Sequence, residues 1–579
     1  MKINFSLFGG LIDRNTKRSR SARRGRTTTR SFRLQLEPLE SRQLLSASAA
    51  TITVQSTNVS VTEGRQFTAQ VATFTESNGD LRPGDFNASI NWGDGTTSAG
   101  VVSSDLVHHQ MKVTGTHTFR EEGTDAITVK VTDRLGNSGV NAFYVQSNLV
   151  SDGSIPAAHT DPNLVNAWGI VPNPTGVWWV NDNGTGLSTL YDGNGNPQSL
   201  VVTIPPPNGS PPGTKAAPTG IVFNSTSDFQ VTGGKGIFIF ATEDGTISAW
   251  NPAILNNAQL KVDNSAANAV YKGLAAGSVG SSNFIYAIDF HNGKIDAFDK
   301  NFAPAALTGS FSDLSLPSGY APFGIANIGG KLYVSYALQD SDAHDDMPGA
   351  GHGFIDVFST DGVLLNHFAA HGNLNSPWGM VLAPSNFGRL SGDLLIGNFG
   401  DGKVNAFDPI TGTLLGQVED SHGKAISDEG LWGLAYGNGA AAGPTNELFF
   451  SSGPGGEQHG LFGGLVAGGT PSIATVADAK LIATPTTITP VRNLPFTLPV
   501  GSFVDQNPFS KARDFTVTID WGDGTPTTTG KVISLGHGMF QVIGTHTYTT
   551  KGKHQINASV ADDGGSTATI KSQAIVLGP

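Results

Sequence analysis

The sequence contains the run Trp168-Gly169-Ile170, and its core, a glycine followed by an apolar side chain, returns five more times. The other copies are Thr219-Gly220-Ile221, Lys272-Gly273-Leu274, Phe323-Gly324-Ile325, Trp378-Gly379-Met380 and Trp432-Gly433-Leu434. The glycines follow one another at intervals of 51, 53, 51, 55 and 54 residues. A period of tens of residues is typical of a repeat architecture.

Each repeat also carries a turn glycine followed by an alternating apolar and polar segment. Examples are Gly293-Lys294-Ile295-Asp296-Ala297-Phe298 and Gly402-Lys403-Val404-Asn405-Ala406-Phe407. Alternation with period two indicates a β-strand. About 50 residues accommodate roughly four short strands with their turns, which is one blade of a β-propeller. The sequence therefore predicts an all-β chain with a six-bladed propeller at its centre.

Composition agrees with a turn-rich β protein of several domains. The chain has 579 residues, only 14% of them charged, and 74 glycines. It contains no cysteine, which excludes disulfides, thiolate metal sites and cysteine nucleophiles.

Charge is unevenly distributed along the chain. The net charge is −12, yet residues 1–46 carry 11 Lys and Arg against 3 Asp and Glu. The remainder is therefore strongly acidic, which argues against nucleic acid as its ligand and is compatible with divalent cations.

Residues 1–50 form a basic leader, in which the Arg-, Ser- and Thr-rich part is predicted to be disordered. The run 36–46, LEPLESRQLLS, resembles the LEPR-XLL-type leader of bacterial surface proteins, and Ala47-Ser48-Ala49 has the form of a signal-peptidase site. A targeting segment is favoured over a basic tail that binds nucleic acid or lipid. No apolar run is long enough to predict a transmembrane helix.

Two regions on either side of the repeats are copies of one small domain. Trp92-Gly93-Asp94-Gly95-Thr96 matches Trp521-Gly522-Asp523-Gly524-Thr525, and each tryptophan precedes a histidine, His117 or His546, by 25 residues. The pattern resembles the PKD family, which implies an Ig-like β-sandwich around a buried tryptophan. We expect the histidines to be structural and hydrogen-bonded, and the aspartates to form turns rather than to bind calcium.

These copies set the predicted domain boundaries. The leader spans 1–50, the first PKD-like β-sandwich 51–147, the propeller 148–480 and the second sandwich 481–579. The last blade is expected to take its outer strand from residues 148–151, which would close the ring. Residues 466–490, rich in Thr, Pro and Ala, are predicted to be a linker.

The central segment resembles an uncharacterised bacterial family of secreted six-bladed propellers, distantly similar to NHL repeats. The residues that carry the resemblance include Asn166-Ala167-Trp168-Gly169, Ser376-Pro377-Trp378-Gly379 and Gly430-Leu431-Trp432-Gly433. The resemblance implies the fold and no established activity. The aromatic residues before the glycines are expected to pack in the core rather than to form a sugar-binding platform.

The loops that enter each first strand and those between second and third strands should open on one face. These loops contain Asn166, Asn183 and Glu457, and the loop 339–352 is longer and more polar than the others. It offers Asp340, Asp342, His344, Asp345 and Asp346 as ligands for Ca²⁺, or for Zn²⁺ or Mn²⁺ if a histidine takes part. The alternative is a solvated acidic loop.

A second candidate site is a ring of oxygen ligands around the propeller axis. Glu243, Asn398 and Asp401 recur at equivalent positions in the blades, with Asp182 and Asp428 as further candidates. A central ion held by such residues would resemble a calcium-dependent propeller hydrolase. Turn formation by these residues is the competing interpretation.

The sequence favours a binding scaffold over an enzyme. We expect a secreted or cell-surface protein of the bacterial envelope that contacts an extracellular protein or polysaccharide, and no nucleic acid. The alternative is a hydrolase or lyase that depends on Ca²⁺ or another divalent metal. No organic cofactor is predicted, and the oligomeric state is open.

Overall fold

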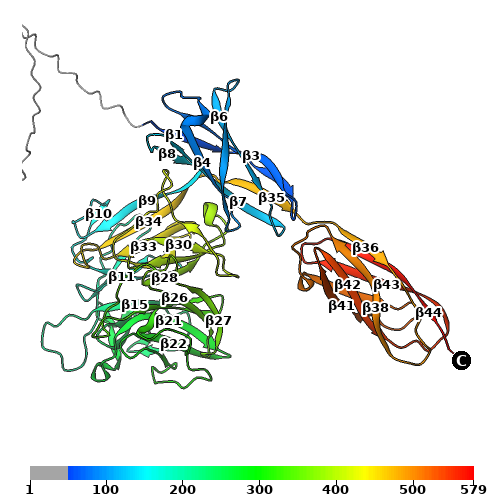
Figure 1. Cartoon of the computed structure of the whole chain (residues 1–579). Coiled ribbons are helices and arrows are strands. Elements are labelled where there is room, and N and C mark those ends of the chain that lie inside the picture. Colours follow the sequence, from blue (N-terminus) through cyan, green and yellow to red (C-terminus); the bar gives the residue numbers. More distant parts are fainter. Residues whose placement is uncertain (1–49, 579) are drawn as a thin grey trace, which may run out of the picture. The chain divides into compact units, whose positions relative to one another are not determined.

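The computed structural model describes residues 50–578, so the predicted leader lies outside the described part except for its last residue. Within 50–578 the regular elements are β-strands and five 3₁₀-helices of three residues each (Figure 1). These short helices are η1 (Pro83–Asp85), η2 (Pro252–Ile254), η3 (Ser265–Ala267), η4 (Gly388–Leu390) and η5 (Ala512–Asp514). No helix of the described part is long and apolar enough to cross a membrane.

The repeats form six sheets whose strands pair antiparallel, except for one short parallel pair at the outer edge of sheet 6. Sheets 1 and 2 are β11 (Ala167–Pro172), β12 (Trp178–Asp182), β13 (Leu187–Tyr191) and β14 (Val202–Thr203), then β15 (Pro218–Phe223), β18 (Phe238–Thr242), β19 (Thr246–Trp250) and β20 (Gln259–Asp263). Sheets 3 and 4 are β21 (Tyr271–Val279), β22 (Ser282–Asp289) and β23 (Lys294–Phe298), then β24 (Tyr320–Ile328), β25 (Lys331–Leu338), β26 (Phe354–Ser359) and β27 (Leu364–Ala370). Sheet 5 is β28 (Pro377–Leu382), β29 (Leu394–Asn398), β30 (Val404–Phe407) and β31 (Leu414–Gln417). A small hairpin, β16 (Gln230–Val231) and β17 (Gly234–Lys235), interrupts sheet 2.

Sheet 6 joins the two ends of the repeat region. It consists of β32 (Leu431–Tyr436), β33 (Glu447–Ser452), β34 (Leu461–Gly469), β9 (Ala142–Ser151) and the short β10 (His159–Thr160). Strand β9 precedes the first repeat and pairs antiparallel with β34. The predicted closure is confirmed, with a strand that begins six residues earlier than expected.

The repeated glycines show why the six sheets form a closed ring. Each lies in the innermost strand of its sheet, and a Cβ atom there would meet backbone of the innermost strand of the next sheet. A Cβ at Gly324 would lie 2.3 Å from the carbonyl oxygen of Trp378, and one at Gly433 in the last sheet would lie 2.7 Å from that of Trp168 in the first. Only glycine permits this approach. The fold is therefore β throughout, with a propeller-like ring.

Each innermost strand also has a register shift at or beside its glycine, for example between Pro322 and Gly324. Such a bulge bends the strand and re-aims its side chains. The residues after the glycines then line a cavity of about 140 Å³ on the ring axis; they include Ile170, Ile221, Leu274, Ile325, Met380 and Leu434.

The first flanking module consists of β1 (Ile52–Ser56), β2 (Val59–Thr62), β3 (Phe67–Glu76), β4 (Phe86–Asn91), β5 (Thr97–Asp105), β6 (Gln110–His117), β7 (Gly123–Asp133), β8 (Ser138–Val140) and β35 (Ser472–Ala477). The last of these follows the ring in the sequence and pairs with both β7 and β2. Its Ala474 and Val476 belong to the same buried core as Trp92.

The second module forms two sheets around one core that includes Trp521. Its strands are β36 (Leu481–Pro485), β37 (Thr487–Ile488), β38 (Phe496–Asp505), β39 (Phe515–Asp520), β40 (Thr528–Thr529), β41 (Lys531–Gly536), β42 (Met539–His546), β43 (Gly552–Asp562) and β44 (Thr567–Val576). The prediction that 466–490 is a linker was wrong, because β35, β36 and β37 lie within it. The Thr-, Pro- and Ala-rich composition suggested a linker, but these strands are formed by pairing with strands elsewhere in the chain.

Candidate functional site

Four of the six residues that precede the repeated glycines, all aromatic, meet inside the ring. Trp168 and Trp432 stack with their centroids 3.4 Å apart, and Trp378 meets both edge-on at 6.0 and 5.7 Å. Phe323 packs against Trp432 in the same cluster. Core packing of these aromatic residues, expected from the sequence, is confirmed.

Lys272 occupies the equivalent position in sheet 3, where three other sheets have tryptophan. Its side chain is 2% exposed, and its Nζ lies 5.2 Å from the ring centroid of Trp168. The ammonium donates to Glu243 and, at 2.8 Å, to Asp345. Burial alone would lower the pKa of Lys272, but the two carboxylates outweigh it and raise that pKa above its usual value. Lys272 is therefore a buried, permanently charged cation.

A chain of hydrogen bonds extends from this ion pair across the ring. Asn183 Nδ2 donates to Glu243 Oε2 at 2.8 Å, and Asn166 Nδ2 donates to Asn183 Oδ1 at 3.2 Å and to Glu457 Oε2 at 2.6 Å. Burial raises the pKa of Glu457 to about 7. These groups come from loops of sheets 1, 2 and 6, the loops that the sequence assigned to one face.

Two members of this chain have unusual backbone conformations. The φ angles of Asn166 and Glu457 are 48° and 68°, in the left-handed region that non-glycine residues rarely adopt. Strained backbone of this kind is concentrated at functional sites, where the surrounding structure holds it in place.

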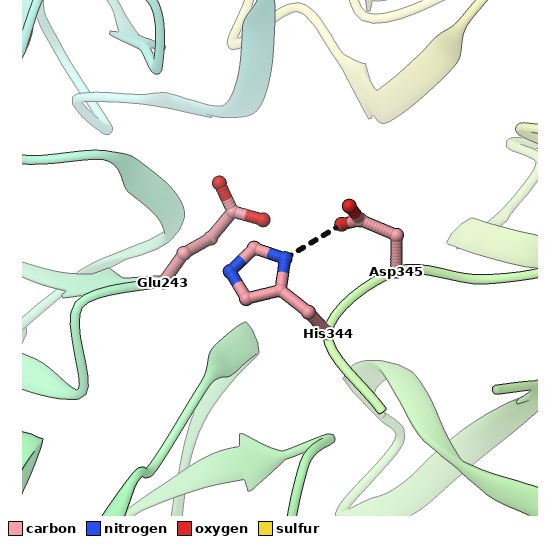
Figure 2. A group of neighbouring side chains, drawn as sticks. All are labelled: Glu243, His344 and Asp345. Carbon is pink, nitrogen blue, oxygen red and sulfur yellow. Dashed lines mark hydrogen bonds and ion pairs between the residues drawn. The ribbon is translucent and has the colours of Figure 1, made fainter. Parts of the chain in front are cut away.

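The loop 339–352 lies between β25 and β26, as predicted, and only part of it contributes to the centre of the ring. His344 and Asp345 point toward Glu243, and the ligating atoms of the three side chains lie within 4.8 Å of one another (Figure 2). His344 Nδ1 is 3.0 Å from Asp345 Oδ1. The sequence placed Glu243 and this loop in separate candidate sites, and the fold joins them.

Among the other loop candidates, Asp340 stabilises the loop itself. Asp340 Oδ1 accepts from the backbone amides of Asp342 at 3.2 Å and His344 at 3.0 Å, which is the turn-forming role of an aspartate. Asp342 is exposed. Asp346 is partly buried, and burial raises the pKa of its carboxyl to about 6.

Asn398 and Asp401 make contacts local to sheet 5. Asn398 Nδ2 donates to the carbonyl oxygen of Asn373 at 2.7 Å and to Asp401 Oδ1 at 3.0 Å. Asp401 Oδ2 pairs with Lys403 at 3.0 Å. The structure thus joins Glu243, His344 and Asp345, and gives Asn398 and Asp401 a role at the turn between β29 and β30.

Sequence reasoning missed Lys272, because it considered only acids, amides and histidines as site residues. The signal was present, since the residue before the repeated glycine is aromatic in four of the six repeats and a lysine in the third. Its effect on the chemistry is large. The ammonium already supplies the positive charge that a metal ion would bring to Glu243 and Asp345.

No family model matches the chain. It is 36% identical over 318 residues to the uncharacterised protein R648 of Acanthamoeba polyphaga mimivirus, covering 52% of this chain and 75% of that protein. It is 35% identical over 345 residues to the uncharacterised protein L690 of the same virus, covering 56% and 86%. A solved structure of a protein of unknown function from Bacteroides thetaiotaomicron VPI-5482 aligns with a TM-score of 0.38 at 12% identity, covering 72% of this chain and 98% of that one.

The assignment to a bacterial family of secreted propellers was therefore wrong, since the curated relatives are viral proteins. Motifs of a few residues around a blade glycine serve the geometry of the ring, so they do not identify a lineage. On the identity and coverage found, the chain belongs to the same family as the mimivirus proteins R648 and L690.

Proposed function

We propose that the protein is a binding scaffold whose ligand contacts the face of the ring around Asn183, Glu243 and His344. The observation that carries this proposal is the chain of hydrogen bonds through Asn166, Asn183 and Glu243 to Lys272, which assembles polar groups from several sheets on one face. A binding site needs a small number of convergent polar groups on a rigid support. A hydroxyl-rich polysaccharide or a polar protein surface fits such a face.

The flanking modules act in this proposal as Ig-like β-sandwich spacers or contact units. We assign them residues 51–141 with 472–477, and 481–578, with the ring formed by the residues between the two parts of the first module. Secretion or attachment to a surface belongs to the same proposal and rests on the basic leader with its Ala47-Ser48-Ala49 motif.

The test is binding of the full chain to a panel of immobilised polysaccharides, measured by biolayer interferometry. Asn183→Ala and His344→Ala should weaken binding at least tenfold, because both side chains lie on the proposed face. Lys331→Ala is the matched control, since Lys331 is exposed at the turn between β24 and β25, the opposite end of the strands. Binding that is lost in Lys331→Ala and kept in the other two variants would reject this face.

A second candidate is a metal-dependent hydrolase or lyase with an ion at the centre of the ring. The observation in its favour is the convergence of Glu243, His344 and Asp345 within 4.8 Å. Calcium titration of the full chain separates the two candidates. If the protein is a binding scaffold, Glu243→Gln should leave its calcium binding unchanged, because the Lys272 ammonium already neutralises these carboxylates. Calcium binding that Glu243→Gln abolishes would favour the enzyme.

A further inference from the structure

A second cluster of ligating side chains lies in sheet 4, away from the ring axis. Asp356 in β26 is the register partner of His367 in β27 and of Val334 in β25. Tyr336 is two residues beyond Val334, so it lies on the same face of the sheet as Asp356 and His367. Pairing of neighbouring strands therefore brings a carboxylate, an imidazole and a phenol together.

A third ligating residue, Asp313, comes from the segment that replaces a fourth strand in sheet 3, between β23 and β24. Ser315 holds this carboxylate through its backbone amide, 2.8 Å from Asp313 Oδ1, and through its hydroxyl at 2.7 Å. The other oxygen, Oδ2, accepts from the same hydroxyl at 2.9 Å and lies 3.4 Å from His367 Nδ1. The same Nδ1 is 3.1 Å from Asp356 Oδ1.

Two buried polar atoms at this cluster, Asp356 Oδ2 and the hydroxyl of Tyr336, have no partner within ordinary hydrogen-bond distance among residues 50–578, and Tyr336 is 2% exposed. The two side chains are near enough to interact with each other, so the phenol offsets part of the cost of burying the carboxylate. A water or an ion would meet the remaining need of Asp356 Oδ2. Burial, together with the charge of Asp313, raises the pKa of the Asp356 carboxyl above its usual value, although His367 opposes the shift. Two buried carboxylates thus face each other with one exposed imidazole beside them.

We propose that Asp313, Asp356 and His367 bind a divalent transition-metal ion, with Zn²⁺ as the best-fitting probe. One donor atom from each residue lies within 4.8 Å of the others. Two carboxylates and an imidazole suit Zn²⁺ or Mn²⁺, whereas Ca²⁺ prefers six to eight oxygen ligands. The ion would neutralise both carboxylates. His367 is 60% exposed, so the ion can enter from solvent and keep a water ligand on that side.

The competing explanation is a protonated His367 that bridges the two aspartates without a metal. Isothermal titration of ZnCl₂ into the untagged, EDTA-stripped full chain distinguishes the two. Wild-type protein should bind one Zn²⁺ through this site, and Asp356→Asn and His367→Gln should each lower the affinity at least 100-fold. His422→Gln is the matched control, because His422 is an exposed histidine beside a single aspartate, Asp420, and it should leave the affinity unchanged.

Thermal unfolding of the same variants distinguishes loss of Zn²⁺ binding from a folding defect. Zn²⁺ should raise the melting temperature of the wild type and leave that of Asp356→Asn unchanged. His367 is exposed, so His367→Gln should retain the wild-type melting temperature in EDTA and still fail to bind Zn²⁺. Absence of Zn²⁺ binding in the wild type, or binding that survives both Asp356→Asn and His367→Gln, would overturn the proposal.

Discussion

The two flanking modules contain the same central arrangement of side chains. In the first, His117 stacks on Trp92 at 4.6 Å between centroids and its Nε2 lies 2.8 Å from Asp94. In the second, His546 stacks on Trp521 at 4.5 Å with its Nε2 2.9 Å from Asp523. The expected structural role of both histidines agrees with this packing and hydrogen bonding.

The modules differ in their last strand. In the second module β44 is continuous and pairs with β43 from Ala561 to Gly552. In the first module β8 pairs with one part of β7, the chain leaves to form the ring, and β35 returns to pair with the remainder as far as Gly123. Because β35 also pairs parallel with β2, as β44 does with β37, it completes the first module in the manner of β44.

Asn141 shows how the break in the strand is accommodated. Its side-chain Oδ1 accepts from the backbone amide of Val129 at 2.8 Å, and its Nδ2 donates to the carbonyl oxygen of Ile127 at 3.2 Å. The corresponding position of the continuous strand is Ile570, a buried core residue. A side-chain amide thus makes hydrogen bonds to β7 where the strand is interrupted, which satisfies buried backbone groups.

The largest effect should come from charges placed in the equivalent core positions Ala474 and Ala574, both fully buried. If β35 is an integral strand, Ala474→Asp should destabilise the first module as much as Ala574→Asp destabilises the second, by about 3 kcal/mol or more. Hydrogen exchange of β7 and β43 peptides measures this. Unchanged protection of β7 in Ala474→Asp would mean that β35 is dispensable.

Asn141→Ala tests whether the side-chain hydrogen bonds of Asn141 stabilise β7 where its partner strand is interrupted. Loss of the side-chain amide leaves the buried amide of Val129 without its partner, so the first module should lose about 1–3 kcal/mol. Denaturant unfolding followed by exchange at β7 gives the value. A change in the free energy of unfolding below about 0.5 kcal/mol would mean that other residues stabilise the interrupted strand.

The stability of the ring and the stability of the modules should respond to pH in opposite directions. Glu457 has its pKa raised to about 7 by burial, from 4.5. The folded ring then binds more protons than the unfolded chain between pH 4.5 and 7, so its stability should fall by up to about 3 kcal/mol as pH rises through that window. Glu457→Gln should flatten this dependence, as measured by melting temperature against pH.

Asp94 and Asp523 behave in the reverse sense. Burial would raise the pKa of each carboxyl, but hydrogen bonds from His117 and His546, and from the neighbouring threonines, hold both below the usual value. Their stabilisation is therefore present above about pH 4 and should be lost as the solution is acidified below it. A module that gains stability below pH 4 would contradict this assignment.

The smallest effect should come from one hydroxyl group that distinguishes two equivalent aromatic residues of the modules. Tyr548 donates its hydroxyl to the carbonyl oxygen of Trp521 at 3.0 Å, and Phe119 holds the matching position in the first module. Tyr548→Phe should lower the free energy of unfolding of the second module by about 1 kcal/mol. Phe119→Tyr should raise that of the first module by a similar amount if the same hydrogen bond can form there. Equilibrium unfolding of both variants checks the pair. Destabilisation by Phe119→Tyr would show that the cores are packed differently.

Much of the architecture could be predicted because its determinants are local or periodic. The interval between glycines predicted six sheets, since each glycine is required where one innermost strand touches the next. The alternation in segments such as 294–298 predicted strands. The repeated Trp-Gly-Asp-Gly-Thr run identified two modules with a buried tryptophan, because the same residues in the same spacing pack in the same way.

The candidate site could be predicted only in part. His344, Asp345 and Glu243 were each recognised as polar loop residues, but their convergence depends on how the loop between β25 and β26 folds over the ring. Lys272 was missed although it stands where four other repeats have an aromatic residue, since the sequence does not indicate which carboxylates neutralise it. The Asp313, Asp356 and His367 cluster was also missed, because it depends on strand register and on an irregular segment.

The sequence by itself determined the strand pattern, the count of the repeats and the existence of two related modules, since these depend on spacing along the chain. Tertiary structure alone decided which charges meet and how the first module is completed. Ion pairs such as Lys272 with Asp345 and ladders such as β35 with β7 join residues far apart in the chain. Their geometry follows from ring closure and strand register, which are properties of the packed fold rather than of any local run of residues.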